Sequence, residues 1–164
     1  MKQQTTINLE IVPTILYRHN IFESKADVIV NPVNCVGAMG AGLALSFANK
    51  FPDMLADYKD KCKHGLVKIG EPYIFTSPNR KILLFPTKDD WKNPSKIEYI
   101  YDGISYLAKN YREMGIKSIA IPALGCGKGQ LSWAEVQPII FFGCLQMGIK
   151  TFIYAPISAE PTGL

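Results

Sequence analysis

The sequence has few residues of the kinds that hold metal ions or form disulfide frameworks. It contains only two histidines, His19 and His64, and four cysteines, Cys35, Cys62, Cys126 and Cys144. The cysteines are too far apart for a CxxC motif, and a chain of this size does not need disulfides to be stable. The two histidines form no metal-ligand cluster with the cysteines or acids in the sequence. We therefore expect reduced thiols, no metal site and no cofactor.

Long apolar runs and blocks of like charge are also absent. No stretch approaches the ~20 apolar residues of a membrane span, and "MKQQTTINLE" has no apolar segment of the kind a signal peptide needs. The net charge of +4 is spread through "KDKCK", "KNPSK" and "KNYR". A net charge of this size is compatible with a phosphate-bearing or nucleic-acid partner but does not predict one. A solvated surface explains the charge equally well. We expect a cytoplasmic protein that does not bind membranes.

The sequence does contain enough apolar residues for a core. They make up 48% of a 164-residue chain, which is about the length of one domain. We expect a single domain over residues 1–157, a flexible tail over 158–164 ("SAEPTGL"), and a monomer.

Strand-like and helix-like segments alternate along the chain. Runs of β-branched and aromatic residues bounded by Gly, Pro or Asn predict strands over 7–12, 26–31, 71–76, 81–87, 117–123 and 150–155. Helical patterns cover 42–51, 52–62 and 96–111, and a further helix begins after Ser132. The S-x-x-E sequences at 95–98 and 132–135 predict capping boxes. Consecutive apolar residues in "SIAIPA" and "DVIVNPV" are typical of strands covered on both faces, so we predict a three-layer α/β/α domain.

Two glycine-rich loops follow predicted strands and precede predicted helices. The first, in "NPVNCVGAMGAGLAL", contains Gly37, Gly40 and Gly42; the second, in "IPALGCGKGQLSW", contains Gly125, Gly127 and Gly129. Glycines let backbone amides approach an anion, and a helix N-terminus adds a favourable dipole. The pair of loops predicts a diphosphate held between them. Neither loop is a standard nucleotide fingerprint, and tight turns or close packing are the alternative use of these glycines.

Four ordered motifs together resemble one family. "ADVIVNPVN", "GAMGAGLAL", "FPTK" and "IPALGCGKGQLSW" are similar to those of macrodomains, the ADP-ribose-binding modules, from about Asn8 to Pro156. Within the family, "NCVGAMGAG", "FPTK..W" and "GCGKGQLSW" most resemble the DNA ADP-ribosyl glycohydrolase antitoxins, and the glutamyl-ADP-ribose hydrolases are a neighbouring branch. The resemblance implies a mixed, mostly parallel central sheet.

By this resemblance, both glycine loops wrap the diphosphate and distal ribose of ADP-ribose. The implied binding residues are Asn20, Ile21, Gly37, Met39, Gly40, Gly42, Leu43, Trp91, Leu124, Gly125, Cys126, Gly127, Lys128 and Gly129. Asn20 stands where many macrodomains have an Asp that receives the adenine amino group, and a neutral carbonyl makes a weaker bond there. An exposed loop lysine is the alternative for Lys128.

The resemblance implies two catalytic residues. Asn34 matches the asparagine that contacts the distal ribose, for which a neutral amide able to donate and accept is well suited. Lys88, in "FPTKDDWK", is the catalytic amine, acting as a nucleophile or in proton transfer. Trp91 stacks on a substrate base or covers the site. The alternatives are a turn held by Asn34, a solvated turn at Lys88, and an indole packed against the next helix.

The resemblance predicts an ADP-ribosyl glycohydrolase that removes ADP-ribose from a nucleic-acid base by a Lys-dependent mechanism. The glutamyl-ADP-ribose hydrolases carry a catalytic Asp where this chain has Gly129, which disfavours their reaction. A non-catalytic ADP-ribose reader and an ADP-ribose 1″-phosphate phosphatase remain as alternatives. The expected ligands are ADP-ribose or ADP-ribosylated DNA, and the expected functional partner is a DNA ADP-ribosyltransferase toxin.

Overall fold

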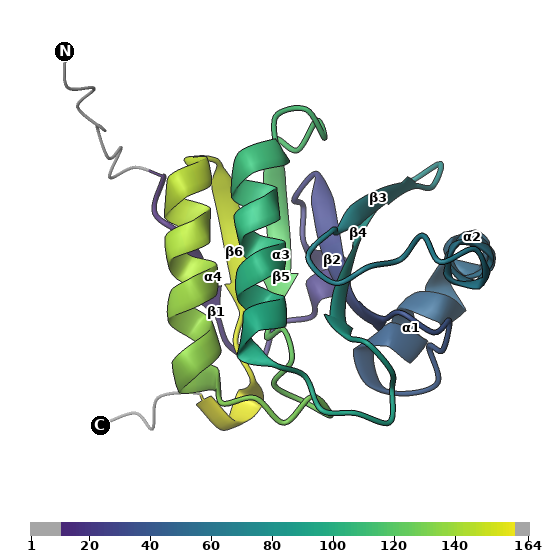
Figure 1. Cartoon of the computed structure of the whole chain (residues 1–164). Helices are drawn as coiled ribbons and strands as arrows, with labels where there is room; N and C mark the ends of the chain where they lie inside the picture. Colours follow the sequence, from purple (N-terminus) through teal and green to yellow (C-terminus); the bar gives the residue numbers. More distant parts are fainter. Residues whose placement is uncertain (1–10, 160–164) are drawn as a thin grey trace, which may run out of the picture.

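A six-stranded sheet forms the centre of the part of the chain that the computed structural model describes, residues 11–159 (Figure 1). Its strands are β1 (Thr14–Leu16), β2 (Val28–Asn34), β3 (Tyr73–Thr76), β4 (Lys81–Lys88), β5 (Ser118–Pro122) and β6 (Lys150–Tyr154). They lie in the order β1-β6-β5-β2-β4-β3. Only β3 pairs with its neighbour in the antiparallel sense. The prediction of a mixed, mostly parallel sheet is confirmed.

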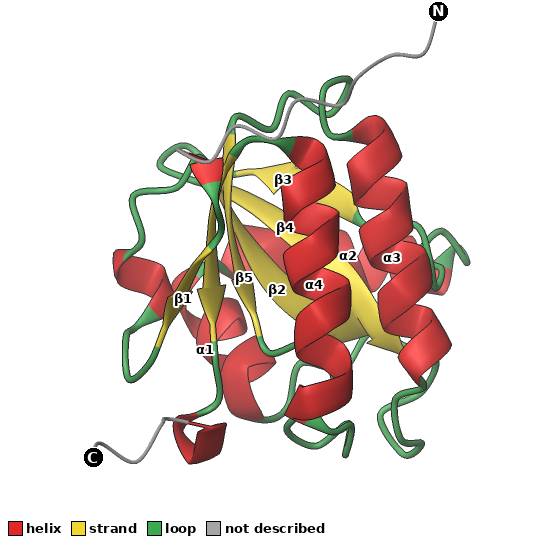
Figure 2. Cartoon of the chain, turned by 90° about the vertical axis from the view of Figure 1, so that its left-hand side faces the viewer, coloured by secondary structure: helices red, strands yellow, loops and turns green. Residues whose placement is uncertain are grey.

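Helices cover both faces of this sheet (Figure 2). They are α1 (Gly42–Lys50), α2 (Pro52–Lys63), α3 (Ile97–Asn110) and α4 (Trp133–Met147), with short 3₁₀ helices η2 (Ile21–Glu23) and η3 (Ile157–Ala159). One buried cluster joins α3 and α4 to the sheet, and a second joins α1 and α2 to its other face. The three-layer α/β/α architecture is therefore confirmed. Within residues 11–159, no helix is both long and apolar enough to cross a membrane.

The central strands contribute side chains to both clusters. In β2, Val28 and Val30 belong to the cluster under α3 and α4, whereas Ile29 and Val33 belong to the cluster under α1 and α2. Successive residues of a strand point to opposite faces, so a sheet covered on both sides needs apolar residues at consecutive positions. This requirement explains why the sequence of β2 reads as a continuous apolar run.

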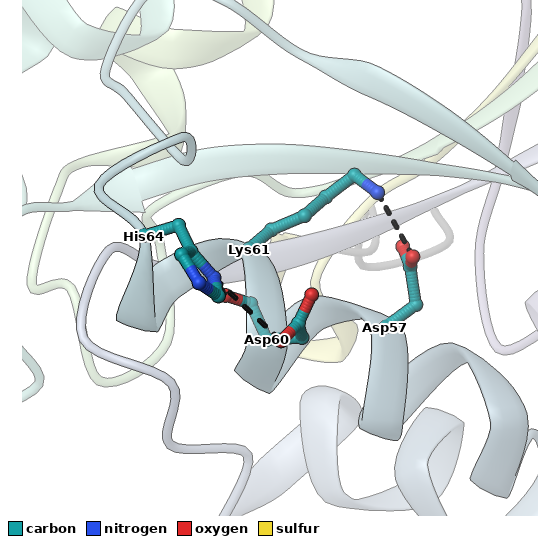
Figure 3. Close-up of polar contacts among 4 residues, drawn as sticks. All are labelled: Asp57, Asp60, Lys61 and His64. Atoms are coloured by element: carbon teal, nitrogen blue, oxygen red, sulfur yellow. Dashed lines mark hydrogen bonds and ion pairs between the residues drawn. The ribbon is translucent and has the colours of Figure 1, made fainter.

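Helix α2 packs through one buried face and has polar pairs beside that face and at its end. Met54 and Tyr58 are fully buried. The Lys61 Nζ lies 2.8 Å from the Asp57 Oδ1 at the part-buried edge of this face, and the His64 Nδ1, after the last turn, lies 2.8 Å from the Asp60 carbonyl oxygen (Figure 3). Pairs this close to the surface stabilise a helix only modestly. The packing of α2 therefore depends mainly on its buried face.

The first strand differs from the prediction. Residues 7–10 of the strand predicted over 7–12 lie outside the described residues, and Ile11 and Val12 belong to no strand. The observed β1 begins at Thr14, directly after Pro13, and pairs with β6 over three residues. Proline has no N–H to give to a sheet and is common at the first residue of a strand, so the pairing begins only beyond it. Ser158 and Ala159 of the predicted tail belong to η3.

The prediction of two capping boxes is wrong, because neither serine side chain caps the helix that follows it. Helix α3 begins after Lys96, and the buried Ser95 hydroxyl has no hydrogen-bond partner in the described part of the chain. Ser132 is the N-cap of α4, but its side chain makes no capping bond. Ser95 instead packs against the second glycine loop, a tertiary contact that the local S-x-x-E pattern does not reveal.

Candidate active site

Asn34 and Lys88 lie opposite each other at the carboxyl ends of two neighbouring parallel strands. The pairing of β2 with β4 runs regularly from Val28 to Val33, which is opposite Pro86, and then shifts so that Asn34 pairs with Lys88. The skipped residue, Thr87, is buried, and its Oγ1 donates a hydrogen bond of 3.4 Å to the Val33 carbonyl oxygen. Ligands of parallel α/β sheets bind at this end of the strands. The shift therefore brings both predicted catalytic residues to one place.

The Asn34 side chain organises the first glycine loop. Its Nδ2 donates to the Ala38 carbonyl oxygen at 2.7 Å, and its Oδ1 accepts from the backbone N–H groups of Val36 and Ala38 at 3.1 and 3.3 Å. Asn34 thus holds the turn after its strand. An amide nitrogen carries two N–H donors, and within residues 11–159 only one of them has a partner. The second remains available to a ligand.

The first loop exposes backbone at the start of α1. Gly37 and Gly42 have φ angles of +89° and +57°, a region that side chains with a Cβ rarely adopt. Ala41 is the N-cap of α1 and forms no side-chain cap. The first amides of a helix have no partner within the helix, so those of α1 can receive an anion. A Cβ added at Gly40 would meet nothing within 4 Å.

The second loop is closed by its own backbone. The Leu131 N–H donates to the Gly125 carbonyl oxygen at 2.9 Å, and the Gln130 N–H donates to the Gly127 carbonyl oxygen at 3.1 Å. Gly125 has a φ of +74°. Gly127 and Lys128 are exposed at the tip of the loop. This loop has the rigidity and the exposed backbone that a phosphate cradle needs.

The turn after β4 contacts both glycine loops. The Cys35 N–H donates to the Asp89 carbonyl oxygen at 3.2 Å, which joins the turn to the first loop. The Ser95 N–H donates to the Gly129 carbonyl oxygen at 3.0 Å, which joins the segment after the turn to the second loop. The Lys88 Nζ lies 3.5 Å from the Trp91 carbonyl oxygen. Lys88 thus begins a segment whose backbone is hydrogen-bonded to both predicted diphosphate loops.

Trp91 and Asp89 complete this turn. The Trp91 side chain is 57% exposed, so the indole is not packed against the following helix. The Asp89 Oδ1 accepts from the Asp90 N–H at 2.7 Å and from the Asn93 Nδ2 at 3.3 Å. These bonds favour the charged form and lower the pKa of the Asp89 carboxyl. The Lys92 Nζ lies 5.5 Å from the centroid of the indole ring, and the exposed part of the ring can meet a substrate.

Several predicted binding residues have buried side chains. Ile21, Met39 and Leu124 are buried in the two cores, which leaves only their main-chain groups for a ligand. Asn20 is exposed, and its side-chain oxygen accepts the Phe22 N–H at 3.0 Å. This bond caps η2, so the carbonyl predicted to receive an adenine amino group already has one donor.

The cysteines are free thiols that burial keeps protonated. Desolvation raises the pKa of Cys126, in the second loop, from 9.0 to about 11, and the pKa of Cys35, beside Asn34, also to about 11. A thiol in this state is a poor nucleophile at neutral pH. Across residues 11–159, His, Cys, Asp and Glu form no group of three or more that could hold a metal ion.

A hollow in the surface lies away from these residues. A groove of about 660 Å³ runs along α3 and contains none of the predicted site residues. It is lined by Gly70, Tyr101, Asp102, Ser105, Tyr106, Ala108, Lys109, Asn110 and Gln146. The candidate site is therefore defined by the chemistry at the strand ends rather than by the size of a cavity.

Two residues of the site were missed by the sequence analysis. The Tyr58 hydroxyl lies 2.7 Å from both the side-chain and the main-chain oxygen of Asn34. Ser95 lies directly beneath Gly129, where an added Cβ would clash with its hydroxyl. Tyr58 occupies the apolar face of α2, four residues after Met54, and this spacing predicts only a core residue.

The fold is that of a macrodomain. Residues 30–140 match the family model described as "Macro domain". The chain therefore belongs to the macrodomain family, and the resemblance drawn from the four motifs is confirmed.

Two curated relatives extend this result. Over 145 residues the chain is 37% identical to a Thermus aquaticus protein named DNA ADP-ribosyl glycohydrolase, an alignment that covers 85% of this chain and 40% of the relative. Over 161 residues it is 35% identical to a Thermosipho africanus DNA ADP-ribosyl transferase-DNA ADP-ribosyl glycohydrolase fusion protein, covering 87% and 42%. The chain spans about two fifths of the length of these relatives.

Two solved structures are similar to this chain over most of its length. The macrodomain of Mycobacterium tuberculosis DarG is 36% identical with a TM-score of 0.83, covering 88% of this chain and 99% of that one. Thermosipho africanus DarTG in complex with ADP-ribose is 34% identical with a TM-score of 0.84, covering 92% and 44%.

Proposed function

We propose that this chain is an ADP-ribosyl glycohydrolase that binds ADP-ribose and removes it from a modified base of DNA. The pairing of Asn34 with Lys88, next to a segment that is hydrogen-bonded to both glycine loops, carries the proposal. The loops supply backbone amides for a diphosphate, and the paired residues supply an amide and an amine beside the sugar that follows it. The names of the curated relatives support DNA as the acceptor.

The proposed reaction breaks the bond between the anomeric carbon of the distal ribose and the base. Water supplies the hydroxyl to that carbon, and a proton goes to the base. Lys88 acts either as a nucleophile, forming a ribosyl adduct that water then hydrolyses, or as the group that transfers the proton. Asn34 would orient the ribose through its second N–H. Both routes for Lys88 require an amine rather than a charge alone.

Two other functions fit the fold. A reader would bind ADP-ribose without chemistry, and a phosphatase would act on ADP-ribose 1″-phosphate. Neither needs the Lys88 amine, whose position directly opposite Asn34 favours the glycohydrolase.

Release of ADP-ribose from an ADP-ribosylated single-stranded DNA oligonucleotide tests the proposal. The intact protein should release ADP-ribose, and Lys88→Ala should not, while both bind ADP-ribose by calorimetry. Binding without release by the intact protein would leave the reader. Removal of phosphate from ADP-ribose 1″-phosphate by both proteins, with no release from DNA, would support the phosphatase.

We also propose that the chain works as a monomer and counters a DNA ADP-ribosyltransferase. The Thermosipho africanus relative, named as a fusion of a transferase with a glycohydrolase, supports this pairing. Co-expression with such a transferase should restore growth, and Lys88→Ala should abolish the rescue.

A further inference from the structure

We infer that Tyr58 is a positioning residue for Asn34, and that its hydroxyl fixes the carboxamide whose second N–H faces the substrate. The inference rests on the proposed function, because it assigns Tyr58 to the same reaction. Tyr58 lies on α2, 24 residues from Asn34, and its side chain is fully buried.

The hydroxyl of Tyr58 makes the shortest hydrogen bond to the Asn34 Oδ1. It lies 2.7 Å from this oxygen, whereas the Val36 and Ala38 amide nitrogens lie 3.1 and 3.3 Å away. The same hydroxyl is 2.7 Å from the Asn34 main-chain oxygen. One buried group thus connects the side chain of Asn34 to the end of β2.

The hydrogen bonds of Asn34 with Val36 and Ala38 allow only one orientation of its side-chain amide. If the Asn34 amide were rotated by 180°, its NH₂ group would face the N–H groups of Val36 and Ala38, and its oxygen would face the Ala38 carbonyl oxygen. Donors would then face donors, and an acceptor would face an acceptor. A donor on the amide oxygen also strengthens the N–H groups of the same amide as donors. The groups of Val36 and Ala38 set which way the amide faces, and the Tyr58 hydroxyl, with the shortest bond to its oxygen, holds the amide in place and strengthens the free N–H as a donor.

Tyr73 provides a matched control. Its hydroxyl is also buried, but it has no hydrogen-bond partner in the described part of the chain. The Tyr73 ring packs against the same core cluster as Tyr58. Tyr58→Phe and Tyr73→Phe each remove one buried hydroxyl from this cluster, and only the first removes a contact with Asn34.

The test compares kcat and KM for release of ADP-ribose from ADP-ribosylated DNA. Tyr58→Phe should lower kcat about ten- to a hundredfold, as expected for a misplaced catalytic group, with KM changed less than about threefold. Tyr73→Phe should match the intact protein. In an Asn34→Ala background, Tyr58→Phe should have no further effect, because the two residues act together.

The outcomes separate this inference from the proposed function. No release by the intact protein would overturn both. Release by the intact protein together with normal kcat for Tyr58→Phe, or an equal loss of kcat in the Asn34→Ala background, would overturn the inference alone. If Tyr58→Phe does not fold, NMR of the intact protein provides a second readout: the Asn34 carboxamide should be as rigid as the backbone around it, and a clearly lower order parameter for its NH₂ group would overturn the inference.

Discussion

Asn34 pairs with Lys88, not with Thr87, because the register of β2 and β4 shifts by one residue between Val33 and Asn34. In a regular ladder, Thr87 would be opposite Asn34. The shift leaves Thr87 buried and extends β4 to Lys88 at the end of the sheet. Irregular pairing at the end of a strand is a common way to direct a side chain into a site.

Lys88→Arg tests whether the site needs an amine or only a positive charge. Arginine keeps the charge, but it stays protonated and is neither a nucleophile nor a proton acceptor. We expect release of ADP-ribose from DNA to fall at least about a hundredfold, with ADP-ribose affinity changed less than about threefold. Lys81→Arg, at the opposite end of the same strand, is the control. Full activity of Lys88→Arg would show that the residue acts through charge alone.

Gly127→Ala separates binding from folding. A Cβ at Gly127 would meet nothing within 4 Å in the protein, so it should alter the stability by only a few tenths of a kcal/mol. If this open space holds the diphosphate, ADP-ribose affinity should fall about tenfold, or 1.4 kcal/mol.

Gly143→Ala should change the stability of the protein and not its affinity for ADP-ribose. Its Cβ would clash with the Ile104 side chain between α3 and α4, far in the fold from the loops. Overpacking of this kind costs about 1–3 kcal/mol of stability and should leave the affinity of the folded protein unchanged. Calorimetry measures the ADP-ribose affinity of Gly127→Ala and Gly143→Ala, and thermal unfolding measures their stability. Unaltered binding by Gly127→Ala would place the diphosphate elsewhere.

Trp91→Ala should affect the DNA substrate more than ADP-ribose. The exposed indole can stack on a base, a contact of about 1–3 kcal/mol, whereas ADP-ribose alone carries no target base. We expect KM for ADP-ribosylated DNA to rise about five- to a hundredfold and the Kd for ADP-ribose to stay constant. Phe142→Ala removes an equally exposed aromatic side chain from α4 and should change neither. An equal loss of affinity for ADP-ribosylated DNA and for ADP-ribose would instead assign Trp91 to the ADP-ribose site.

The Cys126 thiol should react slowly near neutral pH. Burial raises its pKa to about 11, so its thiolate fraction should rise about tenfold per pH unit until the pH approaches 11. Site-resolved mass spectrometry after iodoacetamide treatment from pH 7 to 9 measures this slope. Saturating ADP-ribose should slow the labelling of Cys126 but not that of Cys144, a buried residue of α4. Fast labelling at pH 7 would contradict the assigned environment.

The sequence predicts the parts of the site that local patterns encode. Asn34, Lys88 and the two glycine loops each follow an apolar strand, and parallel strands bring their carboxyl ends together. Tyr58 is different, because a tyrosine on the apolar face of a helix looks like any core residue. Its partner is 24 positions away, and only the packing of α2 on the sheet brings the hydroxyl to Asn34. The local pattern likewise predicts a helix cap at Ser95, because the glycine loop that Ser95 contacts is distant in the sequence.

The two buried tyrosines should differ in stability as well as in activity. Removing the Tyr58 hydroxyl takes a donor from two oxygens of Asn34, so we expect Tyr58→Phe to lower the free energy of unfolding by about 1–2 kcal/mol. Removing the Tyr73 hydroxyl takes away a buried polar group that has no partner in residues 11–159, so Tyr73→Phe should be neutral or stabilising. Burial raises the pKa of both phenols, so both hydroxyls keep their protons and the difference should persist from pH 6 to 9. Urea unfolding of the two variants over this range measures it. Equal losses would mean that the Tyr58 hydroxyl contributes nothing beyond its volume.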